Sequence, residues 1–191
     1  MPLPSTEREL AELFRQLGAP SPEAWAHSQV TEGIPQLMRF LFLKHAWSNV
    51  VSEGDNVWID NAIRLAKARP GLPYAGLGGA LARCRAAGVS SEDLTEIARC
   101  LQAEMLFAIT CLLDDGPPDE SGPGINVSWG LFETDEHGNP TGSHIGGLHE
   151  SVLELDPTGR EMRQNRSGRE AARSGSTAPA QYHPRSARSP E

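Results

Sequence analysis

The chain has 191 residues, of which 38% are hydrophobic and 22% are charged, and its net charge is −8. This composition is typical of one globular domain that can bury a core without disulfides. The charge is uneven, because residues 1–157 carry 10 Lys and Arg against 22 Asp and Glu, whereas residues 158–191 carry seven Arg against three Glu. An acidic body repels phosphate backbones, so we expect no nucleic-acid partner for the folded part.

Several features predict a cytoplasmic protein without a membrane segment. The three cysteines, Cys84, Cys100 and Cys111, form no C-x-x-C pair and are typical of reduced, buried thiols. The start, MPLPSTEREL, lacks the pattern of a secretory signal. The longest apolar run, 105–113, is about half of the roughly 20 residues that span a bilayer. Fifteen arginines against two lysines suggest a GC-rich coding sequence and a bacterial source.

Four amphipathic helices are predicted before residue 70. In the first, Thr6 and Glu9 have the spacing of a capping box and Gly18 ends the helix. Apolar side chains recur at intervals of three and four residues, and Pro70 and Gly71 break the last helix. The predicted positions are residues 5–17, 21–27, a helix opened by Pro35 with a stripe that reaches His45, and 56–68.

Residues 74–88 predict a glycine-rich helix that superficially resembles a phosphate loop. The segment lacks the Lys-Ser/Thr of a P-loop, and Leu81 stands where the dinucleotide fingerprint has its third glycine. We interpret Gly76 and Gly79 as a thin face for close helix packing. No other segment suggests a cofactor, so we predict none.

The clearest helix prediction is residues 90–113. Ser90 and Asp93 have the spacing of a capping box, and Gly116 with two following prolines ends the segment. Its apolar stripe runs through Leu94, Ile97, Leu101, Met105, Ala108 and Leu112. The second half is apolar almost all round, which predicts a central helix that is buried on several sides.

After the loop 114–124 the chain has strand character. Alternation predicts a first strand, and HGNPTG predicts a turn. The alternating apolar residues are Ile125, Val127, Trp129 and Leu131. Residues 144–156 are predicted as the returning strand, with a bulge at Gly146-Gly147. A helix over 148–155 remains an alternative.

Together these elements predict an α+β fold in which five or six helices surround the helix 90–113. One globular domain would cover residues 1–157, with the helical part at 5–115 and a C-terminal β-hairpin at 125–156. Beyond that domain the chain loses its aromatic and branched apolar residues, so residues 158–191 are expected to be disordered.

Residues 130–151 are the best place in the sequence for a metal or acid–base site. The stretch gathers histidines and carboxylates among glycines: His137, His144, His149, Glu133, Asp135, Glu136 and Glu150. His144 and His149 are five residues apart, so on a regular strand they would face opposite sides and could not share an ion. The stretch contains no H-E-x-x-H motif. We favour an exposed hairpin and keep a metal site and a polar contact surface as alternatives.

Two polar residues fall on predicted core stripes and are the catalytic candidates. His45 continues the stripe of the third helix, and Glu104 interrupts that of the long helix. A buried carboxylate needs a partner, and its pKa shifts toward neutrality, so the two groups could act as acid and base. We favour a structural ion pair of Glu104 with His45 or with an arginine such as Arg64 or Arg83.

Aromatic and acidic residues near helix ends are candidate partner-binding groups. Trp25 and Trp47 could anchor a partner, although burial is the preferred interpretation, while Trp58 and Trp129 are predicted to be core residues. An acidic loop follows the long helix and lacks the ligand spacing of a calcium loop. Its members are Asp114, Asp115, Asp119 and Glu120, and Glu133, Asp135 and Glu136 continue the acidic character.

The leading functional hypothesis is a non-catalytic, cytoplasmic protein-binding module whose acidic surface docks on a basic partner. Its sharpest form is an immunity or antitoxin-like neutraliser of a toxin. The alternative is a small hydrolase-type or metal-dependent enzyme that uses His45 with Glu104 or the hairpin histidines. A pocket that joins those groups would favour the enzyme.

Overall fold

A computed structural model describes residues 4–115 and 128–164 of the chain. Within these residues it has seven helices and one pair of antiparallel strands, which confirms the predicted, mostly helical α+β class. The elements are α1 (Glu7–Leu17), α2 (Pro22–Glu32), α3 (Gln36–Trp47), α4 (Val57–Ala68), α5 (Ala75–Ala86), α6 (Ser91–Asp115), β1 (Phe132–Thr134), β2 (Pro140–His144) and α7 (Leu148–Ser151). Among these helices, none combines the length and the apolar sequence that a bilayer crossing requires.

The helix ends follow the local signals in the sequence. Thr6 Oγ1 accepts a hydrogen bond from the Glu9 backbone N–H at 3.3 Å and donates one to the Glu9 carboxylate at 2.8 Å. Ser90 and Asp93 form the same reciprocal pair at the start of α6. Gly18 ends α1 in the left-handed region, with φ 81°. Both predicted capping boxes are therefore confirmed.

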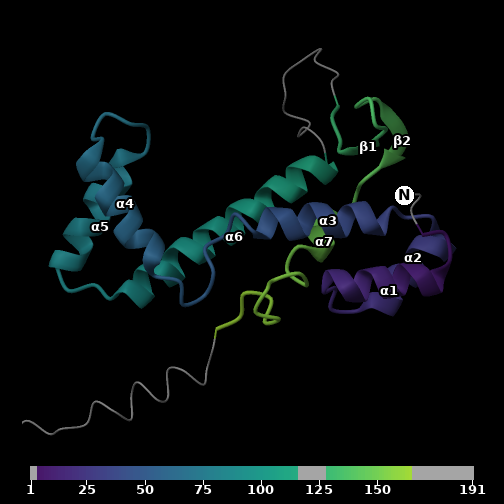
Figure 1. Cartoon of the computed structure of the whole chain (residues 1–191), viewed down its shortest axis with the longest axis horizontal. Helices are drawn as coiled ribbons and strands as arrows, with labels where there is room; N and C mark the ends of the chain where they lie inside the picture. Colours follow the sequence, from purple (N-terminus) through teal and green to yellow (C-terminus); the bar gives the residue numbers. More distant parts are fainter. Residues whose placement is uncertain (1–3, 116–127, 165–191) are drawn as a thin grey trace, which may run out of the picture.

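The helices are arranged along an extended molecule. α6 runs through the middle with α3 beside it, α1 and α2 lie at one end, and α4 and α5 form a hairpin at the other (Figure 1). We call this hairpin, residues 57–88, the α4–α5 arm. The buried apolar side chains accordingly form three clusters.

Each cluster joins a different set of elements. The first joins α1, α2 and α3 around Phe14, Trp25 and Phe40, whose ring centroids are 5.7–5.9 Å apart. The second packs α3 and α6 against α7 and the turn after it. The third fixes the arm to the start of α6, and its buried side chains in the described chain are Ile59, Leu81 and Leu94.

Close packing of the arm depends on Gly78. A Cβ atom at this position would lie 2.3 Å from the Ala62 carbonyl oxygen and 2.6 Å from the Ala66 Cβ. A close approach across a glycine of α5 therefore occurs, but the predicted positions are wrong, because a Cβ at Gly76 would meet nothing within 4 Å and one at Gly79 only the Arg83 side chain of the same helix, at 3.6 Å. Sequence spacing did not separate these neighbouring glycines, because either could face α4.

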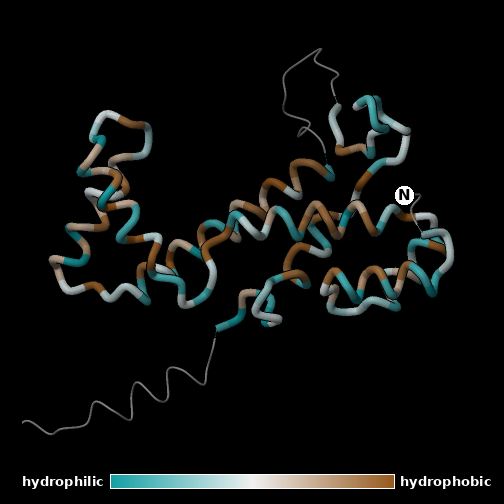
Figure 2. The backbone as a smooth tube through the Cα atoms, viewed as in Figure 1, coloured by the Kyte–Doolittle hydropathy of each residue, from teal (hydrophilic) through white to brown (hydrophobic). Residues whose placement is uncertain are grey.

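α6 is buried on one side only, which corrects the prediction of a helix enclosed on several sides. Its buried residues are Leu94, Thr95, Arg99, Ala103 and Thr110. The rest of the predicted core stripe lies on the opposite side, and its large members, Ile97, Leu101, Met105 and Leu112, are 48–61% exposed. The apolar colour along the C-terminal half of α6 in Figure 2 shows how strongly this helix is hydrophobic. The helical periodicity of the apolar residues predicted the stripe, but it does not predict which part of the protein, if any, packs on it.

The hairpin lies further along the chain than predicted. The first strand begins at Phe132, and the predicted start at Ile125 lies outside the described residues. The cross-strand partners are Phe132 with His144 and Thr134 with Pro140. A returning strand through 144–156 is wrong after His144, because Gly147, with φ 68°, reverses the chain and begins α7. The alternative helix at 148–155 is thus confirmed in its first half.

The folded part continues past the predicted domain boundary. Residues 158–164 form turns, because the Asp156 carboxylate accepts hydrogen bonds from the backbone N–H groups of Thr158 (3.1 Å) and Met162 (2.9 Å). The predicted disorder is therefore wrong for these residues. The rest of the predicted tail, residues 165–191, lies outside the described chain.

Candidate functional site

The exposed side of α6 is the most unusual surface of the described chain. Five large apolar side chains, between 45% and 61% exposed, follow one another at helical spacing. They are Ile97, Leu101, Met105, Ile109 and Leu112, and we call them the α6 apolar strip. A contiguous exposed apolar patch on a monomer often marks an interaction site.

A groove between α3 and α6 adjoins the strip. Its volume is about 630 Å³, and we call it the α3–α6 groove. It is lined by Phe42, His45, Ala46, Asn49 and Val50, and across from them by Leu101, Gln102, Met105, Leu106 and Ile109. The side chains that line the groove include no Lys, Arg, Asp or Glu. The groove therefore suits an apolar or aromatic side chain rather than an ion.

Negative charge borders the strip. Five exposed carboxylates project from α6, and none has an ion-pair partner within residues 4–115 and 128–164. They are Glu104 and Asp115, together with Glu92, Asp93 and Glu96, which line a hollow on the side of α6 that holds Arg99. The one cation of α6, Arg99, is buried on the opposite side. A partner for this surface would thus need apolar side chains flanked by positive charge.

His45 and Glu104 are both exposed, which corrects the prediction that they lie in the core. No hydrogen bond or ion pair joins them to each other or joins Glu104 to an arginine of the described chain. The reason is that Glu104 sits beside the α6 apolar strip, which the chain leaves uncovered. His45 lines the α3–α6 groove instead.

The three hairpin histidines have three separate partners. His137 lies 3.7 Å from the Glu136 carboxylate, and the His144 ring packs on Phe132 with centroids 5.2 Å apart. His149 belongs to α7, where its Nδ1 lies 2.6 Å from Asp114 Oδ2. Within the described residues, no group of three metal-ligating side chains comes together.

Asp114 has a structural role that the sequence did not suggest. Its carboxylate accepts a hydrogen bond from the His149 backbone N–H at 2.8 Å and so binds the start of α7 to the end of α6. Burial raises the pKa of Asp114, but the hydrogen bonds from His149 and Leu148 outweigh it and hold the pKa below its usual value. This contact accounts for an acidic residue at a helix C-terminus, where the dipole disfavours it.

The other acidic candidates are dispersed. Glu150 lies 3.4 Å from the Arg39 guanidinium, and Asp135 accepts hydrogen bonds from the His137 and Asn139 backbone within the hairpin turn. Glu133 is half-buried in β1, while Asp115 and Glu136 are exposed. Asp119 and Glu120 lie outside the described residues.

The preferred interpretation that Trp25 and Trp47 are buried is confirmed, whereas the expectation that Trp129 is a core residue is wrong. Trp25 and Trp47 are 5% and 3% exposed, so neither presents its ring to a partner. Trp58 is half-buried and donates from Nε1 to Thr95 Oγ1 at 3.0 Å. Trp129, predicted to be a core residue, is 45% exposed and donates to the Leu112 carbonyl at 2.7 Å.

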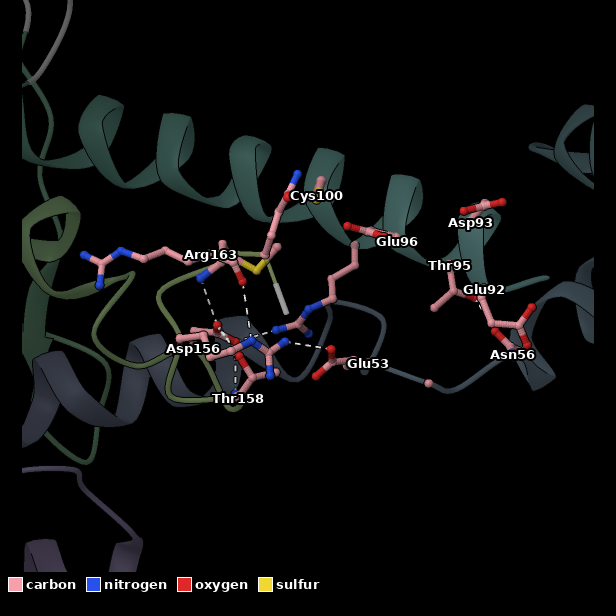
Figure 3. Close-up of a pocket in the computed structure, with 15 residues that line it drawn as sticks. Glu53, Asn56, Glu92, Asp93, Thr95, Glu96, Cys100, Asp156, Thr158 and Arg163 are labelled. Carbon is pink, nitrogen blue, oxygen red and sulfur yellow. Dashed lines mark hydrogen bonds and ion pairs between the residues drawn. The ribbon is translucent and has the colours of Figure 1, made fainter. Parts of the chain in front are cut away.

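A second hollow, of about 490 Å³, lies where the C-terminal turns cross α6 (Figure 3). Its floor is the buried ion pair of Arg99 with Asp156. The Asp156 side chain is fully buried and also accepts a hydrogen bond from Thr158 Oγ1 at 2.6 Å. Burial, with the charges of Glu96 and Glu104, raises the pKa of the Cys100 thiol in its wall, which makes that thiol a poor nucleophile.

The polar groups at the base of this hollow bind one another, whereas the carboxylates of Glu92, Asp93 and Glu96 line its wall without an ion-pair partner in the described chain. Arg99 also donates to the Val51 carbonyl at 3.1 Å, and Arg160 pairs with Glu53 at 2.7 Å. We therefore assign the hollow a structural role. The sequence analysis did not predict this ion pair. The one residue that could have indicated it is Arg99, a lone cation on the side of the helix away from the predicted apolar stripe.

Comparison of the chain with protein-family models, with curated proteins and with solved structures gave no match. The side chains described above therefore carry the functional interpretation by themselves.

Proposed function

We propose that this chain is a non-catalytic protein-binding module that docks on a basic partner through the α6 apolar strip and the α3–α6 groove. The observation that carries the proposal is the strip itself, a continuous apolar surface bordered by unpaired carboxylates. Burial of this surface would favour association by about 25 cal/mol per Å² of apolar area before the costs of association. The acidic border would add steering and specificity toward a cationic surface.

In its sharpest form the proposal is that the chain neutralises a basic toxin by covering its surface, as immunity and antitoxin proteins do. The exposed histidines and Glu104 would then serve solubility and contact rather than bond-making. No observation favours the enzyme alternative, because His45, Glu104 and the hairpin histidines do not converge on one pocket of the described chain.

Affinity capture from the native host tests the proposal. Tagged wild-type chain is compared with the double variant Leu101→Glu, Met105→Glu and with Val30→Glu, an α2 control whose side chain is 45% exposed. We expect a stoichiometric partner on the wild type and on the control at about 50 mM salt, its release at about 500 mM, and its loss from the double variant. Retention of the same partner by the double variant, or no stoichiometric partner at all, contradicts the proposal.

A further inference from the structure

We infer that the occupant of this surface is a second copy of the chain, whose positively charged α4–α5 arm docks in the α3–α6 groove. The inference rests on the proposed function, since it names the occupant of the same surface. In such a dimer each copy would offer one arm and one groove.

The charge of the arm is opposite to that of α6. Residues 57–88 carry five Lys and Arg against one Asp, whereas residues 91–115 carry one Arg against six Asp and Glu. Within the described chain, Arg85 pairs with Asp60, and the other four cations have no ion-pair partner. Those four exposed cations are Arg64, Lys67, Arg69 and Arg83. The arm therefore supplies the positive charge that the border of the strip lacks.

The tip of the arm has the composition of an interface anchor. Leu72, Tyr74 and Leu77 are exposed there, and Tyr74 is 91% exposed. Its φ of 64° lies in the left-handed region, which is unfavourable for a non-glycine residue. The backbone turn that holds it includes a hydrogen bond from the Leu77 N–H to the Tyr74 carbonyl at 3.0 Å. An exposed tyrosine is one of the residue types that dominate interface energies.

The groove complements such a tip. Its volume of about 630 Å³ and its uncharged lining suit an aromatic ring flanked by leucines. Asn49 and His45 at the α3 wall offer polar groups to a phenolic hydroxyl. The exposed carboxylate of Glu104, one residue before Met105 of the groove, can meet a cation of the arm.

The arm does not occupy the groove of its own chain. It attaches at the N-terminal end of α6, whereas the groove follows Leu101–Ile109 further along that helix (Figure 1). The 25 residues of α6 make it about 37 Å long. If two α6 helices pack antiparallel, the arm of each copy comes beside the groove of the other. That arrangement is a closed, two-fold contact in which both copies bury the same surface.

Other occupants fit this surface less well. Direct contact between two α6 strips alone would bring acidic borders together, which costs energy unless cations intervene. The chain beyond residue 164 has a single large apolar residue, Tyr182, so it cannot fill an extended apolar surface.

Sedimentation equilibrium of the purified full chain tests the inference. We expect a wild-type dimer that weakens as salt rises from about 50 to about 500 mM. Tyr74→Gly removes the anchor and suits a positive φ, so it should keep the fold while raising the Kd by about thirtyfold. Met105→Glu in the groove should do the same, and the control Val30→Glu should leave the Kd unchanged. Far-UV circular dichroism verifies that each variant is folded.

Mixing the two weakened variants gives the sharpest test. The arm of Met105→Glu and the groove of Tyr74→Gly are both intact, so an equimolar mixture should form a heterodimer that neither variant forms with itself. A wild-type chain that stays monomeric at about 200 µM, or a Tyr74→Gly dimer as tight as wild type, overturns the inference. In either case, capture of a different partner that depends on Leu101 and Met105 would still support the proposed function.

Discussion

Replacement of Asp156 by alanine is expected to detach the C-terminal turns from α6. The carboxylate of Asp156 is fully buried, pairs with Arg99 and accepts hydrogen bonds from Thr158 and Met162. Loss of one member of a buried ion pair costs about 3–5 kcal/mol, because the other charge is left without compensation. Arg99 would retain its bond to the Val51 carbonyl at 3.1 Å, so we expect a loss of about 3 kcal/mol in the free energy of unfolding.

Urea denaturation followed by circular dichroism at one fixed protein concentration measures this loss. Asp156→Asn is the matched variant, since it keeps the size and one acceptor oxygen, and we expect it to lose about 1–2 kcal/mol. The exposed Asp115→Ala is the control and should stay within about 0.5 kcal/mol of wild type. If Asp156→Ala also unfolded within 0.5 kcal/mol of wild type, the ion pair would not hold these turns and the reasoning would be refuted.

The same ion pair predicts a pH dependence. Burial raises the pKa of Asp156, but hydrogen bonds from Thr158 and Met162 and the charge of Arg99 lower it by more, so the pKa lies below its usual value. A carboxyl group with a lowered folded-state pKa stabilises the fold above its unfolded pKa of about 3.9, and this stabilisation is lost as the pH falls through the folded pKa. The stability difference between wild type and Asp156→Asn should therefore shrink below about pH 5. A constant difference down to pH 3 would contradict the assignment.

Two further substitutions test the packing described above. Gly78→Val would place side-chain atoms against the Ala62 carbonyl, and we expect it to destabilise the α4–α5 arm by about 1–3 kcal/mol. Faster amide hydrogen exchange in α4 and α5 would show this loss. The control Gly76→Val should have a much smaller effect, because a Cβ at Gly76 meets nothing within 4 Å. Asp114→Ala would remove the acceptor for the His149 N–H, and we expect a loss of about 1–3 kcal/mol in urea denaturation; an unchanged midpoint would show that the end of α6 does not hold α7.

Local signals in the sequence predicted local structure well. The capping boxes at Thr6 and Ser90 each need only residues three positions apart, so the starts of α1 and α6 were correctly predicted. Helical periodicity also depends only on residues three and four positions apart, so it correctly predicted the apolar stripes of α3 to α6. The glycine-rich helix was also correct, because no competing turn signal interrupts residues 75–86.

Tertiary contacts between residues far apart in the sequence could not be predicted from such local signals. The stripe through Leu101 and Met105 has the pattern of a core helix, yet the surface that would cover it is not supplied by the described chain. Arg99 and Asp156 are 57 positions apart, and neither residue carries a local signal for the other. The candidate site was missed for the same reason: the sequence predicted apolar character in α6 correctly but assigned it to the interior.

The division of the buried residues into three clusters determines which part of the chain unfolds locally at the lowest free energy. The α4–α5 arm rests on a small cluster at one end of α6, whereas α1 to α3 share a larger aromatic one at the other end. Cooperative units with few buried contacts open at lower free energy than the rest of a protein. Amide protons of the arm should therefore lose protection first under mild denaturant, while those of α1 and α3 remain protected until global unfolding.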